Sequence, residues 1–326
     1  MKKLMATVAL AAALGAVTCA QAQTAKKQSK SWERPCAVAG ENDAFLGIKT
    51  YNLWPGKAPG ALGDKCEDIP AVTEFAPQPG TANGSSVVIF PGGAYVELAA
   101  NLEGRQIADW FAARGFRAFI VSYRLSSNGY LLPVPLLDAR RAIQRVRAGA
   151  AEYQIDPNRI VLIGFSAGGH LAALAATQFV KGNPDATDPV ERVSSRPDYL
   201  VLGYPWIGAI SPDTSHLSYC KLFHVMDRCE ELRAAYSPDL YVTKETPPTF
   251  WYHTFDDQTV PVEQGLKFYE ALVKAGVPAE AHIFYHGSHG SGLGKGNESL
   301  DQWPHLLETW LRLHGLLTQE KFAGSK

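Results

Sequence analysis

The stretch Gly164-Phe165-Ser166-Ala167-Gly168 places one hydroxyl between small residues two positions before and two positions after it. It follows an apolar run of strand type and opens a run with helical spacing. A strand that delivers a serine at a sharp turn into a helix needs small neighbours, because the strained backbone leaves no room for larger ones. Ser166 is therefore a candidate nucleophile, and the turn itself does not require its hydroxyl.

A serine hydroxyl is a weak nucleophile at neutral pH, so it needs a base and a group that orients the base. Chains with a strand, serine and helix in this order supply an acid and then a histidine further along. Asp257 follows a strand-like segment, and Asp256 is its alternative. His289 lies deep in the next glycine-rich loop, where its ring can turn back to the serine, and His286 is its alternative. The sequence thus predicts a triad of Ser166, Asp257 and His289.

Acyl transfer by such a triad also needs backbone N–H groups that stabilise an oxyanion. The residue after the nucleophile supplies one of them, which here is Ala167. The loop "FPGGAY" follows the strand-like "SSVVIF", so we expect Gly93 and Ala94 to supply the others, while Gly92 lets the backbone turn. Neither this chemistry nor the spacing of the potential ligands calls for a metal or another cofactor.

Strand-like and helical segments alternate around these candidates. We expect strands over 85–90, 116–125, 159–165, 198–206, 248–255 and 280–286, and helices over 101–115, 135–153, 167–180, 262–276 and 302–315. Short links between such segments indicate an α/β fold, with a mainly parallel sheet covered by helices on both faces.

Residues 207–248 interrupt this alternation with Pro, Ser and Cys, and contain one short helical stretch, "CEELRAAYS". About 40 residues are long for a connection in a compact domain. We interpret the segment as an inserted cap or lid near the site, with a purely structural excursion as the alternative.

The N-terminal residues have the pattern of a signal peptide. Two lysines precede an apolar run, and Ala20-Gln21-Ala22 offers a cleavage site, so residues 1–22 are expected to be removed. We expect residues 23–50 to be a flexible lead and 51–318 to be a single domain in a periplasmic or secreted protein. Lipid anchoring through Cys19 is disfavoured because the residues before it match that signal poorly. No stable membrane insertion is expected after cleavage.

Four cysteines remain in the mature chain: Cys36, Cys66, Cys220 and Cys229. An even number in an oxidising compartment indicates disulfides, for which three pairings exist. The expected pairs are Cys36 with Cys66 and Cys220 with Cys229, because the members of each pair share an irregular region.

The composition is that of a globular protein, with 46% hydrophobic and 19% charged residues. The formal net charge of −1 provides no excess of basic residues for gripping nucleic acid. Nucleic-acid binding is therefore not expected.

Six segments occur in a characteristic order: "PGGAYVELAANLEG", "VSYRL", "GFSAGGHLAA", "YPW", "HTFDDQTVP" and "HGSHGSGLG". Together they resemble the secreted α/β-hydrolase carbohydrate esterases, which include enzymes similar to acetylxylan and feruloyl esterases. The resemblance runs from about Tyr51 to Gly315. It implies an α/β-hydrolase fold, the same triad, and ester groups on plant cell-wall carbohydrates, acetyl groups above all, as substrates. Pro91 and Ala94 depart from the wider lipase group, where many relatives carry His and a third Gly, and this affects the expected substrate preference.

Four aromatic residues flank the candidate catalytic turns and could stack on sugar rings, although core packing explains them equally well. They are Tyr95, Tyr204, Trp206 and Phe255. Other functions remain open: a serine peptidase of the prolyl-oligopeptidase type, a general carboxylesterase or lipase for small esters, and a non-catalytic binding protein. The peptidase reading is weakened because the chain has no room for the large propeller domain of that group.

Overall fold

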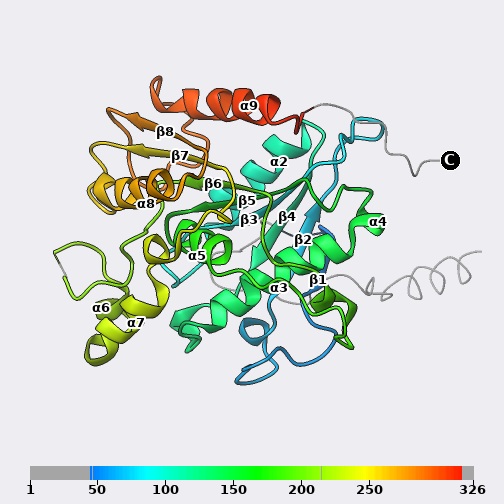
Figure 1. Ribbon diagram of the computed structural model, residues 1–326, viewed down its shortest axis with the longest axis horizontal. Coiled ribbons are helices and arrows are strands. Elements are labelled where there is room, and N and C mark those ends of the chain that lie inside the picture. Colours follow the sequence, from blue (N-terminus) through cyan, green and yellow to red (C-terminus); the bar gives the residue numbers. More distant parts are fainter. Residues whose placement is uncertain (1–44, 46, 214, 318–326) are drawn as a thin grey trace, which may run out of the picture. The chain divides into compact units, whose positions relative to one another are not determined.

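The computed structural model describes Phe45, residues 47–213 and residues 215–317, and its centre is one eight-stranded sheet (Figure 1). The strand order is β1-β2-β4-β3-β5-β6-β7-β8. From β4 to β8 the neighbouring strands are parallel, whereas β2 pairs antiparallel with both β1 and β4. The strands are β1 (Thr50–Asn52), β2 (Ala71–Phe75), β3 (Ser86–Phe90), β4 (Arg117–Ser122), β5 (Ile160–Phe165), β6 (Tyr199–Gly203), β7 (Thr249–Thr254) and β8 (Ala279–Phe284).

Helices cover both faces of the sheet (Figure 1). They are α2 (Gln106–Ala112), α3 (Val134–Ala148), α4 (Ala150–Tyr153), α5 (Ser166–Thr177), α6 (Tyr219–Leu222), α7 (Cys229–Tyr236), α8 (Val262–Ala275) and α9 (Trp303–Leu313). Side chains alternate along each strand. Val88 and Phe90 therefore join the apolar core that includes α3, α5 and α8, while Val87 and Ile89 join the core that includes α2 and α9.

The register of the parallel strands brings the candidate catalytic loops together at the C-terminal ends of these strands. Phe90 pairs with Gly164, and Phe165 pairs with Gly203. Further along, Thr254 pairs with Phe284. The loops that follow β3, β5, β6, β7 and β8 consequently leave the sheet at the same edge, which is where ligands bind in open parallel sheets.

The predicted α/β class and the main alternation of strands and helices are confirmed. The 135–153 helix is divided at Gly149, where a Cβ would lie 2.5 Å from the Tyr153 ring. Strands β1 and β2 were not predicted, and β1 begins at Thr50, inside the expected lead. The buried Thr50 hydroxyl lies 2.9 Å from that of Thr73, so this end of the lead belongs to the sheet.

The expected signal peptide, Cys19, Cys36 and most of the expected lead lie outside the described residues. Within the described ranges, no helix is both long enough and apolar enough to cross a bilayer.

Candidate active site

Ser166 occupies the sharp turn between β5 and α5. Its backbone has a φ of 50°, which is rare for a residue with a side chain. The small residues on either side make this turn possible: a Cβ at Gly164 would lie 2.2 Å from the Gly168 carbonyl oxygen, and one at Gly168 would lie 2.2 Å from that of Phe90. The backbone carbonyl of Ser166 accepts a hydrogen bond from the Trp206 N–H at 2.9 Å. The turn is therefore fixed from both the β3 and the β6 sides.

The structure joins Ser166, His289 and Asp257 in one hydrogen-bonded line. Ser166 Oγ lies 2.7 Å from His289 Nε2, and His289 Nδ1 lies 2.7 Å from Asp257 Oδ2. Because a carboxylate can only accept, the ring proton belongs on Nδ1, which leaves Nε2 free to accept the serine proton. The arrangement can activate the hydroxyl as a nucleophile.

The carboxylate of Asp257 is held by several donors. Its Oδ1 accepts the N–H groups of Thr259 and Val260, each at 2.9 Å. His253 Nε2, which donates to the Val260 carbonyl at 2.9 Å, also lies 3.3 Å from Asp257 Oδ2. Burial alone would raise the pKa of Asp257, but the hydrogen bonds from His253, His289 and Val260 outweigh it and hold this pKa well below its usual range. The group is thus a carboxylate at any pH at which the protein works.

Asp256 and His286, the alternatives left open by the sequence, are bonded to each other at the surface of the protein. Asp256 Oδ2 is 2.8 Å from His286 Nδ1, and Asp256 Oδ1 accepts the Gly287 N–H at 3.0 Å. The His286 side chain is 63% exposed, whereas the His289 side chain is only 15% exposed. The structure brings Asp257 and His289 to the serine and leaves the other pair at the surface.

The loop after β3 lies against the first turn of α5, beside Ser166. Gly93 and Ala94 have positive φ values of 122° and 55°. Within the part of the chain that the structure describes, no hydrogen-bond acceptor is recorded for their N–H groups. Ala167 lies in the first turn of α5, whose N–H groups have no partner inside the helix. This geometry suits the predicted donors to an oxyanion.

Three of the four aromatic residues predicted to contact a sugar are buried, which corrects that prediction. Tyr95 and Trp206 are 0% exposed and Tyr204 is 2% exposed, so none has a free face on which a sugar ring could stack. Tyr95 hydrogen-bonds His170, and Trp206 donates to the Leu217 carbonyl. The core-packing interpretation applies to these three, and only Phe255, at 64%, is exposed.

Glu103 is a residue that the sequence analysis missed. It lies in a π-helical turn, Ala100–Arg105, and is 2% exposed. Its carboxylate accepts hydrogen bonds from the Gly92 N–H and from the Tyr204 hydroxyl. A glutamate near the start of a predicted amphipathic helix has the pattern of a surface residue, so no signal in the sequence distinguishes it.

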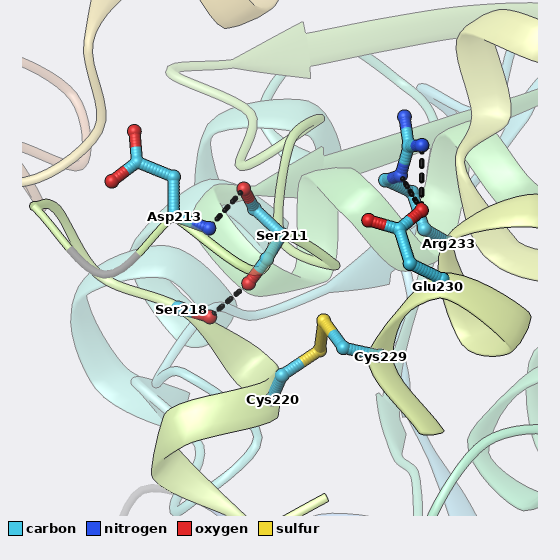
Figure 2. The surroundings of a disulfide bond; sticks show 7 residues. All are labelled: Ser211, Asp213, Ser218, Cys220, Cys229, Glu230 and Arg233. Carbon is cyan, nitrogen blue, oxygen red and sulfur yellow. Dashed lines mark hydrogen bonds and ion pairs between the residues drawn. A yellow bond between two sulfur atoms is a disulfide. The ribbon is translucent and has the colours of Figure 1, made fainter. Parts of the chain in front are cut away.

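The C-terminal part of the segment 207–248 is hydrogen-bonded to α5 and to the residue that follows it. His170 Nε2 donates to the Tyr236 carbonyl, and the Gln178 amide donates to the Ala235 carbonyl, both at 2.8 Å. A disulfide between Cys220 and Cys229 joins α6 to α7, as predicted (Figure 2). Ser218 Oγ donates to the Ser211 carbonyl at 2.6 Å. Figure 2 shows this contact near the disulfide. The function of the segment as a lid stays a prediction.

Cys66 is also disulfide-bonded. Its predicted partner, Cys36, lies outside the described residues. Among the described residues there is no cluster of three or more His, Cys, Asp or Glu side chains that could hold a metal ion.

The buried His170 gives the fold a pH dependence. Burial lowers its pKa to about 4, although the bond to the Tyr236 carbonyl opposes this. An unfolded histidine has a pKa of about 6.5, so above this pH the neutral His170 does not reduce the free energy of unfolding. As the pH drops from about 6.5 towards 4, the unfolded state binds the proton first, and the free energy of unfolding falls. Between about pH 7.5 and pH 4.5, we expect the wild type to lose about 2–3 kcal/mol more unfolding free energy than His170→Gln. Urea titrations at both pH values measure this difference, and parallel losses in the two proteins would contradict it.

Two known families match parts of the chain: residues 75–196 match BD-FAE, and residues 215–314 match the prolyl oligopeptidase family. An acetylxylan esterase of Xylanibacter ruminicola is 32% identical over 238 residues, which are 72% of this chain and 46% of that protein. Endo-1,4-beta-xylanase B of Butyrivibrio fibrisolvens is 32% identical over 230 residues, which are 66% of this chain and 35% of that protein. The chain thus spans less than half the length of these curated relatives.

The fold is also similar to solved structures along nearly their whole length. An acetyl ester-xyloside bifunctional hydrolase from Caldicellulosiruptor lactoaceticus has a TM-score of 0.71 and 34% identity, covering 87% of this chain and 99% of that one. A thermophilic esterase from Thermogutta terrifontis with bound propionate has a TM-score of 0.67 and 26% identity, covering 85% and 97%. With its mainly parallel sheet and this shared sequence, the chain belongs to the α/β-hydrolase carbohydrate esterases.

Proposed function

We propose that the protein is a serine carboxylesterase that removes ester-linked acyl groups, acetyl groups above all, from plant cell-wall carbohydrates. The observation that carries this proposal is the hydrogen-bonded line from Ser166 through His289 to Asp257. The similarity to an acetylxylan esterase and to an acetyl ester-xyloside hydrolase supports the choice of substrate class.

The geometry accounts for each step of acyl transfer. His289 Nε2 takes the proton of Ser166, and the serine oxygen attacks the ester carbonyl. The N–H groups of Gly93, Ala94 and Ala167 then bind the negative oxygen of the tetrahedral intermediate. The imidazolium, stabilised by Asp257, gives its proton to the sugar oxygen as the bond between that oxygen and the acyl carbon breaks, so the sugar leaves as an alcohol. A water molecule, activated by the same histidine, hydrolyses the acyl-enzyme and regenerates the serine. The residues present require no metal or other cofactor for these steps.

We propose a periplasmic or secreted location, which the N-terminal signal pattern favours. The disulfide between Cys220 and Cys229 supports it, because disulfides persist in oxidising compartments.

An exposed pair of aromatic rings is the proposed contact for the carbohydrate. Phe255 follows β7 two residues before Asp257, and Tyr285 follows β8. The two side chains are 64% and 69% exposed. Their ring centroids lie 6.5 Å apart at an interplanar angle of 23°. Nearly parallel exposed rings on the turns that follow β7 and β8 offer a surface on which the apolar face of a sugar can stack.

Acetate release from acetylated xylan tests this proposal. We expect the wild type to release acetate from acetylated xylan faster than it releases acetate from acetylated pectin or ferulate from feruloylated oligosaccharides. Replacing both rings, in Phe255→Ala/Tyr285→Ala, should raise KM for acetylated xylo-oligosaccharides about tenfold, since lost stacking weakens binding by about 1.4 kcal/mol. Hydrolysis of p-nitrophenyl acetate should stay within about twofold of the wild type, because that ester carries no sugar to stack on the rings.

Leu313→Ala is the matched control, since it removes another exposed apolar side chain, on α9. Activity on p-nitrophenyl acetate without any release from polysaccharides would instead indicate a general small-ester esterase. An unchanged KM in the double variant would remove the aromatic pair from the proposed site.

A prolyl-oligopeptidase-type peptidase is the second candidate, because residues 215–314, which include Asp257 and His289, match that family. A prolyl p-nitroanilide separates the two activities. We expect no amide cleavage above the Ser166→Ala background, and cleavage at a rate comparable to that of esters would favour the peptidase.

A further inference from the structure

Glu103 lies where three loops of the candidate site meet. Its Oε2 accepts the Gly92 N–H at 2.6 Å, and its Oε1 accepts the Tyr204 hydroxyl at 2.8 Å. The Tyr204 oxygen in turn accepts the Gly292 N–H at 3.0 Å. One carboxylate and one phenol therefore connect the loops that follow β3, β6 and β8.

These three loops carry the groups proposed to act on the ester. Gly92 immediately precedes the proposed oxyanion donors Gly93 and Ala94, and Gly292 is three residues after His289. The ring of Tyr204 also contacts the His289 ring edge to face, with centroids 5.1 Å apart. The chain of bonds thus reaches both the oxyanion loop and the proposed base.

A neutral side chain could also accept the hydrogen bonds from Gly92 and Tyr204, so the negative charge of Glu103 needs its own explanation. A buried charge is expensive unless it is paired, and no cationic side chain lies within 4 Å of Glu103 among the described ion pairs. Both of its recorded partners are donors, which suits an ionised, acceptor-only carboxylate. The pKa of Glu103 is raised overall, because burial outweighs the opposing hydrogen bonds from Tyr204 and Gly92 and the electrostatic attraction of His289.

The backbone next to His289 approaches this carboxylate closely. A Cβ placed on Gly290 would lie 3.9 Å from Glu103 Oε1. In a water-poor interior, a negative charge at such a position favours a positive charge on the neighbouring imidazole.

We infer that Glu103 is a positioning residue for the proposed ester hydrolysis: it holds the oxyanion loop and the His289 loop in register, and its charge stabilises the imidazolium formed when Ser166 is deprotonated. This inference rests on the proposed function. Asp257 hydrogen-bonds Nδ1 of the imidazole. Glu103 stabilises the imidazolium through its charge, without touching the reacting atoms.

The other titratable groups around Glu103 are tyrosines and His289. Tyr123, Tyr204 and Tyr252 face it from the loop after β4, the loop after β6 and from β7, and burial raises the pKa of all three. Their hydroxyls therefore stay neutral at working pH. Asp257, with His253 behind it, is the remaining charged partner of the imidazole. Removing the charge of Glu103 thus leaves the charges of the other groups around His289 unchanged.

The test compares Glu103→Gln with Tyr204→Phe on p-nitrophenyl acetate. The glutamine can still accept the Gly92 N–H, but it has no charge. We expect kcat to fall about 10- to 100-fold with KM within about twofold, as for lost preorganisation at a reacting centre. The acid limb of the kcat/KM profile, which reports protonation of the base, should move to lower pH because the protonated imidazole loses a stabilising charge.

Tyr204→Phe keeps the charge and breaks the connection to Gly292, so kcat should fall while the acid limb stays in place. Glu97→Gln is the matched control: it removes an exposed carboxylate from the same loop and should leave both readouts unchanged. Circular dichroism verifies that each variant is folded.

The outcomes separate this inference from the proposed function. An active wild type with unchanged kcat and acid limb in Glu103→Gln would overturn the inference alone. A fall in kcat with an unmoved acid limb would reduce Glu103 to a structural role, which also overturns it. If Glu103→Gln does not fold, full activity in Tyr204→Phe would contradict the connection between the loops. A wild type whose esterase activity is absent, or survives Ser166→Ala, would instead reject the proposed function.

Discussion

Replacing Ser166 with alanine is expected to lower kcat for p-nitrophenyl acetate by at least about 10⁴-fold. The variant loses the proposed nucleophile, since Ser166 Oγ lies 2.7 Å from the imidazole nitrogen that takes its proton. The residual rate over water would come from the oxyanion donors and from binding. Steady-state kinetics with a preparation free of contaminating esterases measures the loss.

The fold should survive this substitution. Alanine at position 166 keeps the backbone turn that Gly164 and Gly168 permit, so circular dichroism and the urea midpoint should match the wild type within error. Ser194→Ala is the control and should retain full activity: it removes a hydroxyl that donates to the Val180 carbonyl and accepts the Arg196 N–H, with no bond to the proposed triad. Activity of Ser166→Ala above about a tenth of the wild type would mean that another group is the nucleophile.

Asp257→Asn is expected to lower kcat by about 10³- to 10⁴-fold. The carboxylate accepts the Nδ1–H of His289 at 2.7 Å and thereby fixes the tautomer in which Nε2 can act as a base. An asparagine amide that donates to Nδ1 would favour the opposite tautomer, and it could not stabilise an imidazolium. The kcat of the purified variant on p-nitrophenyl acetate measures this effect.

The adjacent Asp256 provides a control of the same chemistry. Its carboxylate is bound to the exposed His286 and to the Gly287 N–H, so Asp256→Asn should change kcat by less than about threefold. Equal losses in the two variants would show that the geometry assigns the acid to the wrong residue. A large loss of kcat in Asp256→Asn, with kcat unchanged in Asp257→Asn, would mean that Asp256 is the residue that orients the histidine.

The fold was largely predictable because the buried strands have a clear pattern. Strands β3, β5 and β7 are buried along their whole length and are bounded by turn residues, which places the strand ends and hence the loops that carry Ser166 and Asp257. Strands β1 and β2 were not predicted because they are short and lie among prolines and glycines. Their pairing depends on the edge offered by β4, which is a tertiary effect.

The remaining details of the site depend on which way side chains point. Asp256 and Asp257 are neighbours in one turn, and only the folded loop shows which of them reaches His289. Tyr95 and Tyr204 have the residue type of a sugar contact, but both turn inward, where Tyr204 meets Glu103. A sequence with this turn chemistry predicts the reacting groups, whereas the buried residues that hold the loops together become visible only in three dimensions.

Labelling with a fluorophosphonate, followed by intact-mass and peptide mass spectrometry, is the most direct test of the proposal that Ser166 is an activated nucleophile. We expect one equivalent of phosphonate on the peptide that contains Ser166, loss of esterase activity in proportion to labelling, and no adduct on Ser166→Ala. Labelling should also slow strongly in Asp257→Asn, because the reagent reports activation by His289 and not exposure. An active enzyme that takes up no label, or takes it up at a different residue, would contradict the account.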